Sequence, residues 1–294
     1  AYYPHPKSCI YKLNSRKIVK YNSNESGILT SALSNGSTFW NYYEGKDLGE
    51  IWGYEYDGFY TVDDFTDTSS WKLKEGVPSI DGYNPRPGDV KFKNLMDDDR
   101  GTNMISSGDN TVSNPGDRKV IGNNTPRYLY GITLGANFKG FDLNVFMQGT
   151  GKRDAWIANN LKFPLYSDFK FIALYKDLGN YWKPVDAANG DYTAANPNAE
   201  FPRIYGNYGN QGSNYRQSDK YLSDASYFRI KNVTLSYTFP KAWITKASLS
   251  QLKAFVSIEN LATFSSLPKG IDPETLSWNY PAFRTVSFGL NVTL

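Results

Sequence analysis

The stretch GITLGANFKGFDLNVFMQ, residues 131–148, decides the fold because its hydrophobic residues recur at every second position. Such a two-residue period is typical of a β-strand with one apolar face. Lys139 and Gly140 interrupt the pattern, and a two-residue loop that contains glycine is what a tight hairpin requires. This turn pairs Phe138 with Phe141, and the pairing places the apolar residues of both strands on one side of the sheet.

The same alternation returns in residues 232–239, 252–259 and 285–294. In the five segments together, every position of one face is apolar, whereas only Phe146 and Phe255 are apolar on the other face. The sequence therefore predicts five antiparallel strands that share one apolar face.

Short and long connections alternate along these strands. The 139–140 turn and the 240–251 link are short, whereas residues 149–226 and 261–284 form long connections. Transmembrane β-barrels have short turns on the periplasmic side, long loops on the external side and aromatic girdles at both interfaces. Aromatic residues do lie near the strand ends, with Tyr128 and Tyr130 at one end and Phe138, Phe141 and Trp243 at the other.

Composition excludes several other classes of protein. The 294 residues carry 32 Lys and Arg against 29 Asp and Glu, so a net charge of +3 gives no reason to expect nucleic acid as a partner. No run approaches the ~18 apolar residues of a membrane helix. A single Cys and a single His allow neither an internal disulfide nor a Cys/His metal cluster.

No catalytic pattern emerges, so we expect no enzyme and no cofactor. The GTGK run at residues 149–152 lacks the spacing of a phosphate-binding loop. Asp97, Asp99 and Asp109 are weak candidates for a calcium loop, which needs oxygen ligands at alternating positions. The competing interpretation of these residues is a solvated acidic turn.

The segments outside the alternating strands are less regular. Residues 10–21 and 48–60 are predicted as strands, and residues 61–124 mainly as loop because they are rich in Asp, Gly, Ser and Pro. The 149–226 connection interleaves aromatic residues with Asn, Gly and Asp, which indicates an ordered surface facing a substrate or partner. Its candidate contact residues are Trp156, Tyr166, Tyr181, Trp182, Tyr205 and Tyr208.

Several motifs resemble one known family. TPRYLYGITLGANFKGFDLNVFMQG (125–149), YFRIKNVTLSYTFPKAW (227–243) and YPAFRTVSFGLNVTL (280–294) are similar to segments of the SusC/RagA family of TonB-dependent outer-membrane transporters of Bacteroidetes. Residues 44–60 and 256–274 agree with the family in the same order. Two details depart from it: residues 97–101 lack the family's DxNGDG spacing, and the chain ends in Leu294 where an aromatic residue is usual.

The resemblance implies an all-β fold, an antiparallel transmembrane β-barrel segment. Residues 1–294 would be the C-terminal part of a roughly 22-stranded barrel, with 149–226 and 261–284 as extracellular loops. Residues 285–294 would be the last strand and carry the assembly signal. Its lipid-facing residues would be Val286, Phe288, Leu290, Val292 and Leu294.

Five to seven strands cannot close a barrel, and an open sheet in lipid leaves unpaired backbone groups. We therefore expect the plug and the N-terminal half, absent from this sequence, to be supplied by the remainder of the same transporter barrel.

The resemblance also implies a function. It implies uptake of bulky nutrients, either glycan oligosaccharides or peptides, across the outer membrane of a Gram-negative bacterium. A SusD-like surface lipoprotein would form the lid, and TonB would supply energy through the missing half. The alternative is a secreted β-sandwich that binds glycans and packs its two apolar faces together. Exposure of Leu134, Val256 and Leu290 separates the two, because a sandwich covers them.

Overall fold

The computed structural model describes residues 11–14, 17–20, 46–80, 82–96, 103–109, 114–158, 162–163, 179–205, 213–245, 248–276 and 282–294. The chain divides into two compact units. The first, which we call the loop unit, comprises Ala1–Thr125 and Trp156–Leu222. The second, the sheet unit, comprises Pro126–Ala155 and Ser223–Leu294.

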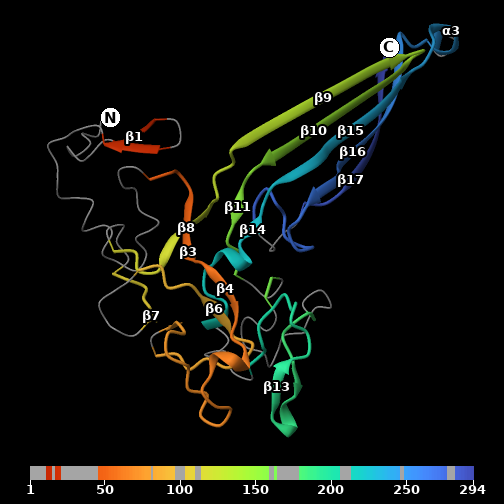
Figure 1. Cartoon of the computed structure of the whole chain (residues 1–294). Coiled ribbons are helices and arrows are strands. Elements are labelled where there is room, and N and C mark those ends of the chain that lie inside the picture. The colour runs from red at the N-terminus through yellow and green to blue at the C-terminus, as the bar shows by residue number, and fades with distance from the viewer. Residues whose placement is uncertain are drawn as a thin grey trace, which may run out of the picture. The chain divides into compact units, whose positions relative to one another are not determined.

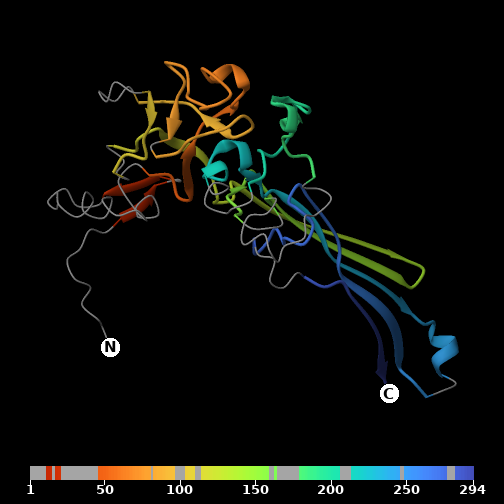
Figure 2. The same cartoon turned by 90° about the horizontal axis from the view of Figure 1, so that it is seen from below.

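The sheet unit is built on five long antiparallel strands in the order β17-β16-β15-β10-β9 (Figures 1 and 2). Each strand lies next to the strand of this sheet that follows it along the chain. The predicted antiparallel architecture is therefore confirmed. The strands are β9 (Tyr128–Phe138), β10 (Phe141–Gly151), β15 (Tyr227–Thr238), β16 (Gln251–Ser265) and β17 (Thr285–Thr293).

The hairpin of β9 and β10 has the register that its turn predicts. Phe138 pairs with Phe141, and Ile132 pairs with Met147 at the far end. Both turn residues have positive φ, 48° at Lys139 and 88° at Gly140. Positive φ at both central residues is the signature of the turn whose twist matches that of paired strands.

A β-bulge at Lys231 explains why the alternation in the third strand becomes visible only from Asn232. Asn232 pairs with Phe146 and Ile230 pairs with Met147, so Lys231 is an extra residue in β15. An inserted residue reverses the face on which the following side chains lie. Arg229 and Asn232 therefore share a face although they lie three positions apart.

The strands extend further than the alternation alone indicated. β10 continues to Gly151 and β16 to Ser265, so both long connections begin with strand residues. A two-residue pair, β11 (Asp154–Ala155) with β14 (Ser223–Asp224), follows, and the short link holds α3 (Lys241–Ile244). Among the described residues, we find no helix whose length and apolar character would let it cross a membrane.

The loop unit consists of short strand pairs and single helical turns. The 61–124 segment, predicted mainly as loop, contributes four strands of two to six residues, and the predicted strand at 10–21 is a pair of four-residue strands. The pairs are β1 (Tyr11–Asn14) with β2 (Lys17–Lys20), β3 (Glu50–Tyr54) with β8 (Arg118–Asn123), β4 (Tyr56–Phe59) with β6 (Val90–Phe92), β5 (Ser79–Ile80) with β7 (Met104–Ile105), and β12 (Pro184–Asp186) with β13 (Asp191–Ala194). The 3₁₀ turns are η2 (Val62–Asp64), η5 (Ala187–Asn189) and η6 (Asp219–Tyr221).

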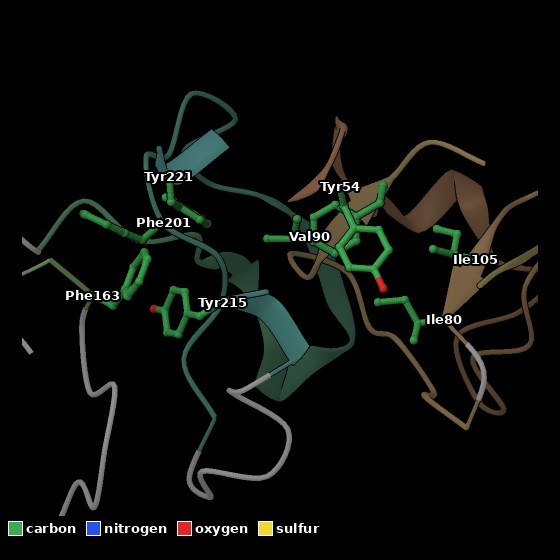
Figure 3. Packing of buried hydrophobic residues seen from close by; sticks show 9 residues of the cluster. Tyr54, Ile80, Val90, Ile105, Phe163, Phe201, Tyr215 and Tyr221 are labelled. Atoms are coloured by element: carbon green, nitrogen blue, oxygen red, sulfur yellow. The ribbon is translucent and has the colours of Figure 1, made fainter. Parts of the chain in front are cut away.

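The loop unit has an aromatic core of its own. Phe163 stacks on Tyr215 with 4.4 Å between ring centroids and meets the edge of Tyr221 at 5.1 Å. These residues of the long connection share one buried cluster with residues that lie between Tyr54 and Ile105 in the sequence (Figure 3). Among the described residues, the buried members of this cluster are Tyr54, Ile80, Val90, Phe92, Ile105, Phe163, Phe201, Tyr215 and Tyr221.

Candidate functional site

The apolar side chains of the five long strands form one continuous face of the sheet, which we call the apolar face. Strand register aligns these residues in rows that cross all five strands. One such row is Leu134, Val145, Val233, Ile258 and Val286. The face is thus a property of the whole sheet and not of a single hairpin.

Much of the apolar face is solvent-exposed in this chain. Leu134 is 57% exposed and Leu290 is 67% exposed, while Val256 is partly buried within the sheet. All five predicted lipid-facing residues of the last strand, Val286 to Leu294, are at least 50% exposed. Monomeric soluble proteins rarely expose contiguous apolar patches larger than a few hundred Å². The face therefore requires an apolar surrounding that the described residues do not supply.

Aromatic residues gather near both ends of the sheet. At the short-turn end, Phe141 lies against Tyr237 with 4.5 Å between centroids, and the Trp243 side chain is exposed. At the opposite, loop end, the exposed aromatic residues include Tyr128 and Phe264. Two aromatic belts of this kind are typical of strands that cross a bilayer.

The other face of the sheet, which we call the polar face, carries hydroxyl, amide and charged side chains that bond to one another. Lys253 Nζ lies 3.0 Å from Asp142 Oδ2, across three neighbouring strands. The Ser257 hydroxyl lies 3.0 Å from both Thr234 Oγ1 and Asn232 Nδ2. These pairs are compatible with a hydrated surface.

The two aromatic exceptions on the polar face each cover a glycine of an edge strand. Phe146 reaches across β9 so that its Cε2 would lie 3.5 Å from a Cβ at Gly131. Phe255 occupies the space above Gly289, where a Cβ would lie 2.3 Å from its Cζ. An aromatic ring that covers a glycine restores the packing that the missing side chain would have made.

A charged cluster fixes part of the 261–284 connection to the loop end of the polar face. Arg229 on β15 is 2% exposed, and its Nη2 lies 3.0 Å from Asp272 Oδ2. Its Nη1 lies 3.1 Å from Glu274 Oε2. Glu274 also binds Lys231 Nζ at 3.2 Å and accepts a hydrogen bond from Gln148 Nε2. Buried charges are stable only when they are paired in this way.

Burial and hydrogen bonding within this cluster act in opposite directions on the pKa of Asp272. Burial alone would raise the pKa of this carboxyl. The backbone N–H of Glu274 and the Arg229 guanidinium both donate to it, however, and together they hold its pKa below the ordinary value. Asp272 is therefore ionised at neutral pH.

In the loop unit, the predicted contact aromatics serve mainly in packing. The Trp182 ring lies over Gly88 and is only 5% exposed, so it belongs to the interior and not to the surface predicted for it. Trp156 and Tyr181 are partly buried against the aromatic core. Tyr166 and Tyr208 lie outside the described residues.

Tyr205 belongs to a buried hydrogen-bond network that the sequence did not indicate. Asp89 is fully buried, and its Oδ2 accepts hydrogen bonds from the hydroxyls of Tyr205 at 2.5 Å and Tyr83 at 2.8 Å. Its Oδ1 accepts from Asn214 Nδ2 at 3.0 Å. Burial raises the pKa of Asp89, and these donors only partly offset it. No local signal reveals this site, because two of its partners lie more than 110 residues away.

The weak metal candidates gain no support. Asp97 and Asp99 lie outside the described residues, whereas Asp109 lies within them. Within the part of the chain that the structure describes, no group of three or more His, Cys, Asp or Glu residues is placed to hold a metal ion.

Comparison with known proteins gives consistent relatives. No protein-family model matches the chain. TonB-dependent receptor P3 of Formosa agariphila is 29% identical over 85% of this chain, and TonB-dependent receptor P26 of the same organism is 24% identical over 76%. The RagAB peptide importer, in its closed-closed state, matches 94% of the chain with a TM-score of 0.56 and 18% identity. Its open-open state gives a TM-score of 0.54.

These comparisons define the class of protein: the chain has the fold of a segment of a TonB-dependent transporter barrel. The resemblance to the SusC/RagA family is thereby confirmed, as is the predicted location in the outer membrane of Bacteroidetes. The relatives are receptors and importers and not enzymes. The chain spans 22% of receptor P3 and 26% of the RagAB chain.

Proposed function

We propose that this chain forms part of the wall and external loops of an outer-membrane active transporter for bulky nutrients. The observation that carries the proposal is the exposed apolar face, which lies opposite the polar face across a single layer of strands. Strands of 9 to 15 residues meet the ~9–11 residues that a tilted strand needs to cross the hydrocarbon core. Lipid would then contact the apolar face, and the barrel lumen would adjoin the polar face.

The remainder of the barrel completes the proposal. The outer strands β9 and β17 each have one neighbour within this sheet. Unpaired strand edges are not stable in lipid. We propose that strands from the rest of the same transporter pair with both edges, as in a closed barrel, and that residues 285–294 form its last strand.

The partners and the substrate follow from the family resemblance. A SusD-like surface lipoprotein would close over the external loops, and TonB would energise transport. The substrate would be an oligosaccharide or a peptide; the RagAB neighbours are named as peptide importers. Tyr181 and Tyr205, both partly buried, remain candidates for contact with the substrate or the lipoprotein.

The alternative, a secreted β-sandwich that binds glycans, requires a second sheet over the apolar face. The described residues place no such sheet over Leu134 or Leu290. This observation favours the transporter.

Site-directed nitroxide labelling of the complete transporter in lipid tests the proposal. In a background without other cysteines, with Cys9 replaced by Ser, Leu290→Cys and Asn291→Cys place labels on opposite faces of β17. The label at 290 should collide mainly with oxygen, which partitions into lipid, and the label at 291 mainly with a water-soluble nickel chelate. Equal accessibility of the two labels to the nickel chelate would exclude the lipid-facing assignment.

A further inference from the structure

The polar face contains a hollow near its loop end, of about 360 Å³, between β9, β10 and β15. Five of its seven lining residues lie on the polar face according to strand register: Leu129, Gly131, Phe146, Gln148 and Tyr227. The other two, Tyr130 and Gly149, belong to the apolar face and border the hollow at its edge. Under the proposed function, the hollow opens toward the lumen through which the substrate passes. Its volume is within the range of small-molecule sites.

Gly131 creates the floor of the hollow. A side chain here would stand beside the Phe146 ring, whereas glycine leaves that ring as the wall. Phe146 is partly exposed and offers its ring to the hollow, whereas Tyr227 lines the hollow but is buried. Aromatic rings offer a large rigid apolar surface at low cost in conformational entropy.

The polar part of the hollow is held in one orientation. Gln148 lines the hollow and its Nε2 donates to Glu274. Glu274 is in turn fixed by Arg229 Nη1 at 3.1 Å and Lys231 Nζ at 3.2 Å. The two cations balance the carboxylates of Asp272 and Glu274, so the rim carries hydrogen-bonding groups without a net charge.

We propose that this hollow is a subsite for a neutral sugar ring of an oligosaccharide, an inference that rests on the proposed function. The C–H face of a pyranose would pack against Phe146, and its hydroxyls would bond to the Gln148 carboxamide and the Glu274 carboxylate. Arg229 acts as a positioning residue for Glu274. A sugar fits better than a charged peptide because every lining side chain is uncharged and the adjacent charges are already paired.

The test uses the complete transporter in detergent, applied to an array of neutral α- and β-linked oligosaccharides and to an array of heptapeptides. Phe146→Ala should weaken oligosaccharide binding about tenfold, the factor that corresponds to about 1.4 kcal/mol. Phe146→Tyr, which keeps the ring, should bind like the parent. Phe255→Ala is the matched control, because it also uncovers an edge-strand glycine on this face but lies outside the hollow.

Gln148→Leu provides a second variant that keeps the Phe146 ring, should Phe146→Ala fail to assemble. It should also weaken oligosaccharide binding. Binding of peptides alone, of no probe at all, or of oligosaccharides with unchanged affinity in both Phe146→Ala and Gln148→Leu would overturn the subsite. The nitroxide measurement at position 290, made in lipid on the Leu290→Cys protein, separates this failure from failure of the proposed function.

Discussion

The ring of Phe255 on β16 fills the space that a side chain at Gly289 on β17 would occupy. The two residues are direct cross-strand partners, and a Cβ at 289 would lie 2.3 Å from Phe255 Cζ. Phe146 lies beside Gly131 on β9 more loosely, because a Cβ at 131 would be in ordinary contact with it, at 3.5 Å from Cε2. Both glycines lie on the outer strands of the sheet, so the two aromatic residues that break the polar pattern have a packing reason.

Replacement of Gly289 should therefore destabilise the sheet. In Gly289→Val the new side chain would displace the Phe255 ring, an overpacking that costs about 1–3 kcal/mol. The urea midpoint of the transporter in lipid vesicles measures the effect. Ser287→Val is the control, since position 287 lies on the same strand and face and is exposed. A midpoint for Gly289→Val no lower than that for Ser287→Val would contradict this packing.

Charge on the two faces should have unequal effects. Leu290→Arg places a cation on the apolar face and should cost about 2–4 kcal/mol near the bilayer midplane. Asn291→Arg, one residue further along β17, points to the polar face and should change stability far less. Folded yield in the outer membrane and unfolding in vesicles both report the difference. Equal losses in the two variants would mean that the faces are assigned wrongly.

The sheet could be predicted from sequence because its information is local. The turn at Lys139 and Gly140 fixes one register, and apolar residues at every second position fix the face. Two irregularities disturbed this inference: the bulge at Lys231 in β15 and the register shift at residues 260–261 of β16, where Asn260 has a φ of 52°. An inserted residue reverses the alternation, so residues 227–230, which precede the bulge in β15, do not continue the two-residue period of residues 232–239.

The loop unit could not be predicted in the same way. Its strands have two to six residues, which is too short to show a period. Its core joins Tyr54 and Phe92 to Phe163 and Tyr215, residues that lie far apart in the sequence. The aromatic residues of the long connection predicted an ordered surface, yet Trp182 and Tyr215 turned out to be buried. Composition shows that aromatic residues are present but not which of them pack together.

Removal of the Arg229 guanidinium should release residues 266–276 from the polar face. Arg229→Ala leaves Asp272 without its buried partner, and breaking a buried ion pair costs about 3–5 kcal/mol. Hydrogen-exchange mass spectrometry of peptides within 266–276 should show faster exchange. Arg229→Lys keeps the charge without the forked geometry and should give an intermediate rate. Unchanged exchange in Arg229→Ala would show that other contacts hold this segment.

Acid should loosen the same segment. Because the pKa of Asp272 is held below its ordinary value of 3.8, the ionised carboxyl stabilises the cluster. That contribution is complete above the ordinary value and is lost as the pH falls through the lowered one. Exchange in 266–276, corrected for its intrinsic pH dependence, should therefore rise below about pH 4. The Asp272→Asn variant should not show this step, and a step of equal size in it would assign the effect to another group.

Asp89 should respond to pH in the opposite sense. Burial raises its pKa, so the folded loop unit binds a proton more tightly than the unfolded chain does. Stability from this group is complete below the ordinary value of 3.8 and is lost as the pH rises through the raised value. Protection of peptides within 83–92 should consequently increase as the pH is lowered from neutral toward 4. In Asp89→Asn the neutral amide cannot titrate, so this gain in protection should disappear. The variant should also start from a lower protection, because an amide accepts fewer of the hydrogen bonds from Tyr83, Tyr205 and Asn214. A gain of the same size in both proteins would show that Asp89 is not the titrating group.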